Sequence, residues 1–213
     1  MRLRKVKNLE ARLDTCRGRL LLEKEPTCFQ SVFGNDHPVI AEFGIGRGKF
    51  ILEMAKRHPE KNFFGVERVD SVMIQAMEKV REEKNIRYLI ANVEDLVEIL
   101  PDNSLSGLFL NFSDPWPKKR NRKRRLTYRD YLKQYDRWLI EGSTVQLKTD
   151  SDILFAFSIE EVSQTGHILR DVTLDLSKSS AYEDNIRTEY EERFAEQELP
   201  IRALRYDSGK ALL

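Results

Sequence analysis

The sequence predicts an α/β protein in which a doubly wound, mostly parallel sheet carries helices on both faces. Three observations predict this fold class. From residue 38 onward, short apolar runs with strand composition alternate with amphipathic helical patterns. A glycine-rich turn joins the first predicted strand to the first predicted helix. Acidic, amide or glycine residues follow several of the strands directly, at the edge where such sheets bind their ligands.

Each predicted strand is an apolar run bounded by polar or turn-forming residues. In chain order these strands are residues 39–43, 62–67, 86–91, 106–112, 143–149, 168–176 and 201–206. The predicted helices between them are residues 49–57, 70–83, 93–100, 126–139, 153–164 and 189–197. Helical spacing in the second helix unites Val72, Ala76 and Val80, and in the fourth it brings Tyr131, Tyr135 and Trp138 near one face. Right-handed crossovers then align the strand ends along one edge of a Rossmann-like sheet.

Composition narrows the class of protein further. The 213 residues are enough for one sizeable domain, and no stretch approaches the ~20 apolar residues that span a bilayer. Cys16 and Cys28 give no disulfide framework, and the three histidines are scattered without metal-ligand spacing. The N-terminus shows no apolar signal region. We therefore expect a cytoplasmic protein without a bound metal or a membrane segment.

A net charge of only +1 hides a strong asymmetry along the chain. Residues 1–19 hold seven Lys or Arg against two acids, and residues 118–125 hold seven more cations. Residues 151–200 hold twelve acids against four Lys or Arg. This segregation favours one basic face for a polyanion over two ordinary solvated faces. We expect a basic, partly helical arm at residues 1–30 and a single domain at residues 31–213.

The stretch from Asn111 to Arg125 combines a strand end, a carboxylate, an aromatic ring and the densest basic run of the chain. Asp114 stands between the apolar strand and the cations, and two prolines flank Trp116. This arrangement predicts a binding site for an anionic polymer beside a reactive centre. The alternative is that Asp114 only caps a turn and that the cations are solvated.

The segment E-F-G-I-G-R-G at residues 42–48 predicts a cofactor turn. Glycines allow a tight turn and let a ligand approach the main chain. The segment is not the G-x-G-x-x-G fingerprint of dinucleotide sites, because Lys49 stands at the third glycine position. Glu67 ends the next strand, where an acid can accept hydrogen bonds from ribose hydroxyls. Glu42 before the glycines favours a cationic cofactor such as S-adenosylmethionine, with NAD as the competitor.

Six segments together resemble the bacterial tRNA (guanine-N(7)-)-methyltransferase family and cover nearly the whole chain in the family's order. They are E-F-G-I-G-R-G, N-F-F-G-V-E, L-N-F-S-D-P-W-P-K-K-R, K-R-R-L-T-Y, L-K-T-D and T-E-Y-E. The resemblance implies the class I S-adenosylmethionine-dependent methyltransferase fold, a seven-stranded sheet with an antiparallel last strand. It also implies methylation of nitrogen-7 of a guanosine in the tRNA variable loop, by a monomer or a homodimer.

The resemblance assigns roles to matching positions. Asp114 matches the catalytic aspartate, and it joins the implied cofactor-binding residues Glu42, Gly44, Gly46, Glu67 and Asn92. The family usually has aspartate where this chain has Asn92. Substrate binding is implied for Lys118, Asp150, Thr188 and Glu191. RNA contact is implied for Arg120, Arg122, Lys123, Arg124 and Arg125, with Asn121 where many members have histidine.

The residues also allow structural roles and other functions. Asp150 precedes a predicted helix that it can cap, and Thr188-x-x-Glu191 is a capping box as written. Trp116 is either a stacking face for an extracted base or a core residue. The S-D-P-W segment distantly resembles the motif of adenine amino-methyltransferases, with Trp116 replacing a proline. A non-enzymatic RNA-binding protein is the third function that the sequence leaves open.

Overall fold

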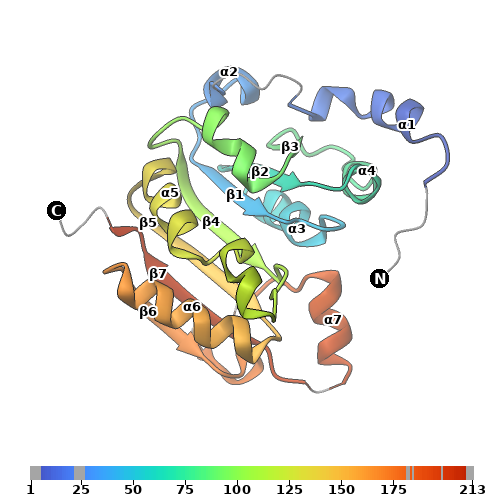
Figure 1. The fold of residues 1–213 in the computed structure, drawn as a ribbon. Coiled ribbons are helices and arrows are strands. Elements are labelled where there is room, and N and C mark those ends of the chain that lie inside the picture. The colour runs from blue at the N-terminus through green and yellow to red at the C-terminus, as the bar shows by residue number, and fades with distance from the viewer. Residues whose placement is uncertain (1–5, 22–26, 181–182, 184, 198, 210–213) are drawn as a thin grey trace. The chain divides into compact units, whose positions relative to one another are not determined.

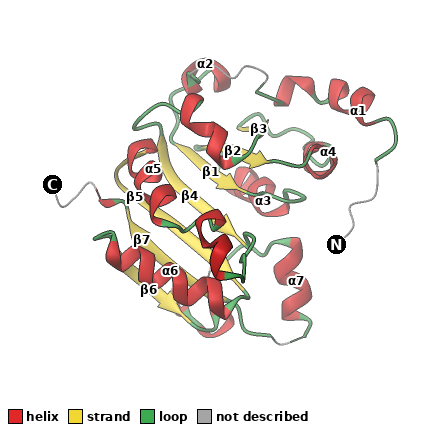
Figure 2. Ribbon diagram, in the orientation of Figure 1, coloured by secondary structure: helices red, strands yellow, loops and turns green. Residues whose placement is uncertain are grey.

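The computed structural model describes residues 6–21, 27–180, 183, 185–197 and 199–209 (Figure 1). Its contacts divide the chain into two compact units, residues 1–100 and 101–213. Among the described residues, the fold is a seven-stranded, mostly parallel sheet with antiparallel last strands and surrounding helices (Figure 2). This confirms the predicted fold class.

The N-terminal unit contains three parallel strands in the order β3-β2-β1. The strands are β1 (Val39–Phe43), β2 (Asn62–Glu67) and β3 (Ile86–Ile90). Its helices are α1 (Leu9–Thr15), η1 (Arg17–Arg19), α2 (Phe29–Phe33), α3 (Lys49–Arg57), α4 (Asp70–Met77) and η2 (Val93–Glu98). Phe43 is paired with Val66, and Glu67 with Ile90, so the carboxyl ends of these strands share one edge.

The described part of the N-terminal segment packs onto the body of its own unit. The Cys16 side chain belongs to the same buried cluster as Phe63, Met73 and Tyr88. Arg12 of α1 donates hydrogen bonds of 2.7 and 2.6 Å to the Glu78 carboxylate at the end of α4. The Leu21 N–H donates to the Tyr88 carbonyl at 2.8 Å, beside the outer side of β3. Residues 1–5 and 22–26 of the predicted basic arm lie outside the described residues.

The C-terminal unit contains four strands in the order β4-β5-β7-β6. β4 (Leu105–Asn111) and β5 (Leu139–Thr149) are parallel, whereas β7 (Arg202–Asp207) is antiparallel to both β5 and β6 (Ile168–Thr173). Its helices are η3 (Lys119–Arg124), α5 (Arg129–Trp138), α6 (Asp152–Gln164), η4 (Leu176–Lys178) and α7 (Glu189–Ala195). α6 packs on β5, β6 and β7, and α5 packs on β5 and α6 (Figure 1).

The predictions for β1, β2 and α3 have the observed boundaries, whereas four predicted helices are too long, two of them by three residues or more at one end. The helix expected to reach residue 83 ends at Met77, and farther along the chain the Glu83 carboxylate accepts the N–H groups of Arg81 and Glu82. The helix expected from residue 126 begins at Arg129, whose N–H donates to the Glu161 carboxylate at 2.8 Å. At Arg129, a side chain from a distant helix therefore contributes to the boundary.

Within the described ranges, no helix is long and apolar enough to cross a membrane. The same residues contain no group of three or more His, Cys, Asp or Glu side chains that could hold a metal ion.

Candidate functional site

The glycine-rich turn between β1 and α3 is tied to the end of β2. The N–H groups of Gly44 and Ile45 both donate to the Val66 carbonyl, at 2.8 and 3.1 Å. Gly44 and Gly46 have φ angles of 77° and 56°, in the left-handed region that favours glycine. A Cβ atom at either position would meet no heavy atom within 4 Å. A ligand can therefore approach the main chain at Gly44 and Gly46 from the side on which any other residue would carry its Cβ atom.

Glu67, at the end of β2, is fixed beside this turn. One carboxylate oxygen accepts the Gly46 N–H at 3.1 Å, and the other accepts the Val69 N–H at 3.1 Å. Each oxygen has a second lone pair, so the carboxylate can accept further hydrogen bonds from a ligand. The turn and the end of β2 thus bring together three residues that the sequence predicts as cofactor ligands: Gly44, Gly46 and Glu67.

Glu42 and Asn92 occupy different surroundings in the same unit. Glu42 is buried in β1, with 2% of its surface exposed. Asn92 is exposed at the start of η2, where its side-chain amide donates to the Asp95 carboxylate at 3.3 Å. The Asn92 side chain and the Asp95 carboxylate form a capping box, in which Asn92 accepts the Asp95 N–H and Asp95 accepts the Asn92 N–H. Asp95, which the sequence analysis missed, also places a carboxylate close to the position where the resembled family has one.

In the C-terminal unit, Asp114 is exposed on a strained turn after β4. Phe112 and Trp116, on either side of it, have φ angles of 53° and 40°, which are rare for aromatic residues. The Phe112 N–H donates to the Lys148 carbonyl at 2.8 Å, which ties the start of the turn to β5. The Trp116 ring is partly buried, and the Arg124 guanidinium lies 4.3 Å from its centroid.

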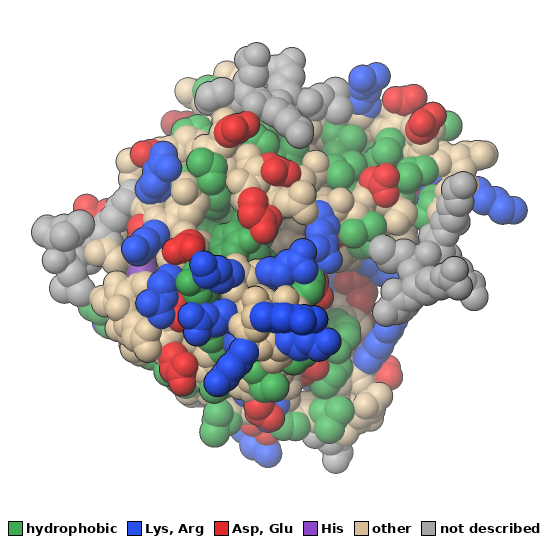
Figure 3. Space-filling model, in the orientation of Figure 1, with side chains coloured by type: hydrophobic (Ala, Val, Ile, Leu, Met, Phe, Trp, Pro, Cys, Tyr) green, Lys and Arg blue, Asp and Glu red, His purple; other side chains and the backbone are tan. Residues whose placement is uncertain are grey.

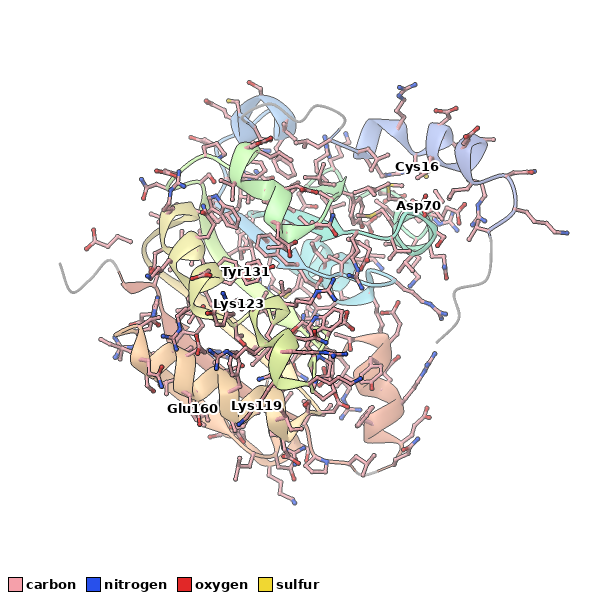
Figure 4. All side chains as sticks on the ribbon, in the orientation of Figure 1. Cys16, Asp70, Lys119, Lys123, Tyr131 and Glu160 are labelled. Atoms are coloured by element: carbon pink, nitrogen blue, oxygen red, sulfur yellow. The ribbon has the colours of Figure 1, made fainter. Side chains whose placement is uncertain are left out.

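The basic run that follows forms a surface over η3. Lys and Arg side chains gather over the yellow-green segment of Figure 1 (Figure 3), and Lys119 and Lys123 are labelled in Figure 4. The exposed members of the run are Lys118, Lys119, Arg120, Arg122, Lys123 and Arg124. Arg125 differs from them, since only 5% of its surface is exposed.

Lys148, near the end of β5, is a fully buried cation with three acceptors. Its Nζ donates to the Glu191 carboxylate at 2.8 Å, to the Ile186 carbonyl at 2.9 Å and to the Asn185 side chain at 3.0 Å. The Asn185 amide donates to the other Glu191 oxygen at 2.5 Å. Both oxygens of Glu191, for which the sequence predicts substrate binding, are thus engaged within the protein.

Thr188 caps α7, as the local pattern allows. Its hydroxyl accepts the Glu191 N–H at 3.0 Å. In the described contacts the Glu191 side chain turns to Lys148, so it does not complete the predicted capping box. At the end of β5, Ser151 caps α6 by accepting the Leu154 N–H at 3.2 Å. The alternative that Asp150 is this cap is therefore wrong.

Asp150 instead contacts Tyr190, another residue that the sequence analysis missed. The Tyr190 hydroxyl donates to the Asp150 carboxylate at 3.4 Å. Its ring centroid lies 5.0 Å from that of Phe112 and 4.9 Å from that of Phe194. Burial and the charge of Asp150 raise the pKa of Tyr190. The aromatic residue between the two acids of T-E-Y-E is the sequence signal that could have identified it.

Comparison with known proteins gives the family. The model described as "Putative methyltransferase" matches residues 36–204. A tRNA (guanine-N(7)-)-methyltransferase of Geobacillus kaustophilus is 48% identical over 169 residues, which are 78% of this chain and 77% of the relative. A protein of the same name from Streptococcus mutans is 41% identical over 201 residues, 92% of this chain and 95% of the relative. The chain belongs to the tRNA (guanine-N(7)-)-methyltransferase family.

Solved structures agree on the fold of this methyltransferase. An antibiotic-related methyltransferase has a TM-score of 0.62 at 17% identity and covers 89% of this chain and 98% of its own. Fibrillarin of Aeropyrum pernix, solved with bound S-adenosyl-L-methionine, has a TM-score of 0.56 at 15% identity, over 80% of this chain and 66% of its own. Both structural similarities confirm the methyltransferase fold. At these sequence identities they concern the fold alone.

The electrostatics of Glu67 in this methyltransferase give a first prediction. Burial raises the pKa of the carboxyl, although the Val69 and Gly46 N–H groups act in the opposite direction. The folded protein then holds the proton more tightly than the unfolded chain does, so the free energy of unfolding falls as pH rises between the unfolded and folded pKa values. Glu67→Gln is expected to lose this component of the pH dependence in urea unfolding. The exposed Glu98→Gln is the matched control, and an unchanged slope in Glu67→Gln would contradict the prediction.

Proposed function

We propose that this protein transfers a methyl group from S-adenosylmethionine to nitrogen-7 of a guanosine in the tRNA variable loop. The products are 7-methylguanosine and S-adenosylhomocysteine. The observation that carries the proposal is the exposed Asp114 on a turn that runs directly into a basic surface, in a chain of this family. The tRNA and the guanine come from the names of the relatives, and the local chemistry is consistent with both.

The N-terminal unit offers groups that fit the cofactor. Gly44 and Gly46 leave the main chain of the turn open, and Glu67 is held with acceptor capacity for two ribose hydroxyls. The buried carboxyl group of Glu42 suits the ammonium or sulfonium of S-adenosylmethionine better than the pyrophosphate of NAD. Asn92 is our candidate for a contact with the adenine. When bound, the cofactor supplies an electrophilic methyl carbon.

The reaction needs little from the protein beyond alignment and charge. Guanine nitrogen-7 already has an in-plane lone pair, so no strong base is required. The ring gains positive charge as the new bond to carbon forms, and the Asp114 carboxylate would stabilise that charge. Correct alignment of the lone pair can contribute several kcal/mol to lowering the barrier. Asp114 is therefore our candidate catalytic residue.

Recognition of guanine also calls for carboxylates, which accept hydrogen bonds from its ring N–H and exocyclic amine. Adenine cannot offer this pattern of donors. Asp150 is our candidate for this role, and Lys118 and Thr188 are candidates for further substrate contacts. For Glu191, which is engaged with Lys148, we propose that it holds α7 in place for substrate binding.

The exposed cations of η3 are our candidates for binding tRNA phosphates. Arg120, Arg122, Lys123 and Arg124 project from one short segment, and such contacts orient an RNA without specifying its base. We further propose that residues 31–213 work as one methyltransferase domain, that residues 1–30 are an arm, and that the protein acts in the cytoplasm.

The test of this function is transfer of a labelled methyl group from S-adenosylmethionine to unmodified tRNA, followed by nucleoside analysis. The expected product is 7-methylguanosine, which makes the RNA chain cleavable by borohydride and aniline. A methylated adenine would replace the proposal with the amino-methyltransferase. Absence of transfer, with intact tRNA binding, would support the RNA-binding protein instead.

A further inference from the structure

Arg125 ends a run of exposed cations but points into the protein. Its Nε donates to the Pro115 carbonyl at 2.9 Å, and its Nη2 donates to the Trp116 carbonyl at 3.0 Å. The guanidinium also lies 4.3 Å from the ring centroid of Phe157 on α6. Burial lowers the pKa of Arg125. One guanidinium thus connects the D-P-W-P turn to a helix that lies later in the chain.

The two acceptors of Arg125 flank the strained residue of the turn. The Pro115 and Trp116 carbonyls belong to the peptide groups on the two sides of the Trp116 Cα, where φ is 40°. A bulky residue in this region is strained and persists only where its surroundings fix it. Two hydrogen bonds from a charged donor can offset such strain.

Neighbouring arginines in the run therefore have different environments. Arg124 is exposed and covers the Trp116 ring, whereas Arg125 is buried and holds the Trp116 main chain. An RNA phosphate can reach Arg124 without any rearrangement of the turn. A phosphate contact by Arg125 would require the loss of both carbonyl hydrogen bonds and of the packing on Phe157.

We infer that Arg125 is a positioning residue: it fixes the turn that carries Asp114 and Trp116, and it takes no part in RNA binding. This inference rests on the proposed function for its effect on turnover. It replaces the sequence-based assignment of Arg125 to RNA contact. Arginine suits the role because its planar fork donates to two carbonyls while one face packs on an aromatic ring, which lysine cannot reproduce.

The test compares Arg125→Lys, which keeps the charge, and Arg125→Gln, which removes it, with two variants that each lose one exposed cation. Arg122→Ala removes an exposed cation that we assign to RNA, and Lys133→Ala removes an exposed cation on α5 outside the site. For each variant, kcat and KM for tRNA are measured together with the salt dependence of tRNA binding. Tryptophan emission of the free protein reports on the turn, and a Trp116→Phe protein identifies the contribution of that ring.

Arg125→Lys is expected to lower kcat on the order of ten- to a hundredfold, because a displaced turn misaligns the reacting groups. Its KM for tRNA should match that of Lys133→Ala. The salt slope of tRNA binding by Arg125→Gln, which lacks the charge, should also match that of Lys133→Ala. Arg122→Ala is expected to flatten the slope of log K against log salt by roughly 0.7–0.9, the value for one lost phosphate contact. The Trp116 emission should change in Arg125→Lys and not in Lys133→Ala.

A flattened salt slope in Arg125→Gln would overturn the inference, because loss of the charge would then have removed a phosphate contact. Unchanged kcat and unchanged Trp116 emission in Arg125→Lys would overturn it equally. Phe157→Leu provides a second variant that leaves the arginine in place and removes its aromatic support, and the same emission change is expected, with a smaller amplitude. If the wild type fails to methylate tRNA, the proposed function fails, while the emission and salt measurements still decide the role of Arg125.

Discussion

Replacing Asp114 by alanine is expected to reduce methyl transfer to tRNA by roughly 10²–10³-fold, the range for removal of one group that stabilises transition-state charge. The carboxylate is exposed on its turn, so its loss should leave the fold intact. Affinity for tRNA should remain near that of the wild type, because phosphate contacts dominate such affinity and Asp114 makes none. Single-turnover transfer at saturating tRNA, paired with a binding isotherm, measures the two effects separately.

Asp114→Asn is the informative companion to this variant. It keeps the shape of the side chain and one acceptor oxygen, and it removes the negative charge. If stabilisation of the cationic guanine is the main role, Asp114→Asn should lose nearly as much rate as Asp114→Ala. Substantial recovery in Asp114→Asn would indicate hydrogen bonding instead, and near-normal turnover of both variants would exclude a catalytic role for this residue.

The largest loss of stability is expected from breaking the buried pair between Lys148 and Glu191. Lys148 is 0% exposed and Glu191 3% exposed, at a separation of 2.8 Å. Glu191→Ala would leave a buried ammonium without its carboxylate, which typically costs about 3–5 kcal/mol. Urea unfolding should report this loss. Glu192→Ala, an exposed neighbour on the same helix, is the control.

A double variant distinguishes the charge from the packing. Lys148→Met with Glu191→Leu removes both ions and keeps similar volumes, so it should recover most of the stability that Glu191→Ala loses. A loss of less than about 1 kcal/mol in the free energy of unfolding of Glu191→Ala would contradict this prediction. It would show that water, or a position facing the substrate, already compensates the charge of Lys148. Methyl transfer by the double variant then tests whether the pair also holds Tyr190 beside Asp150.

Local patterns in the sequence were sufficient for the parts of the fold that depend on neighbours in the chain. β1, β2 and α3 begin and end where apolar periodicity and the glycine turn predict, since each is set by residues inside it. The arrangement of Gly44, Gly46 and Glu67 follows in the same way, because consecutive parallel strands bring their ends together.

The sequence could not reveal roles that depend on distant partners. In a run of seven basic residues, nothing distinguishes Arg125 from Arg124 until Phe157 and the Pro115 carbonyl are placed beside it. Lys148 looks like a polar residue at a strand end, and its burial depends on Glu191, 43 positions later. Side-chain direction within a charged segment is a tertiary property, and it decides here which cations can meet RNA.

The contact between the N-terminal segment and β3 has a consequence for the behaviour of the protein in solution. β3 has β2 on one side, and in the described residues Leu20 and Leu21 lie along the other side at Tyr88. An uncovered strand edge is a template for pairing with another chain and hence for aggregation. Leu20 and Leu21 cover this edge of β3, and Cys16 of the same segment is buried in the core. The segment that the sequence predicts as a basic arm therefore covers a strand edge through which the folded protein could otherwise pair with another chain.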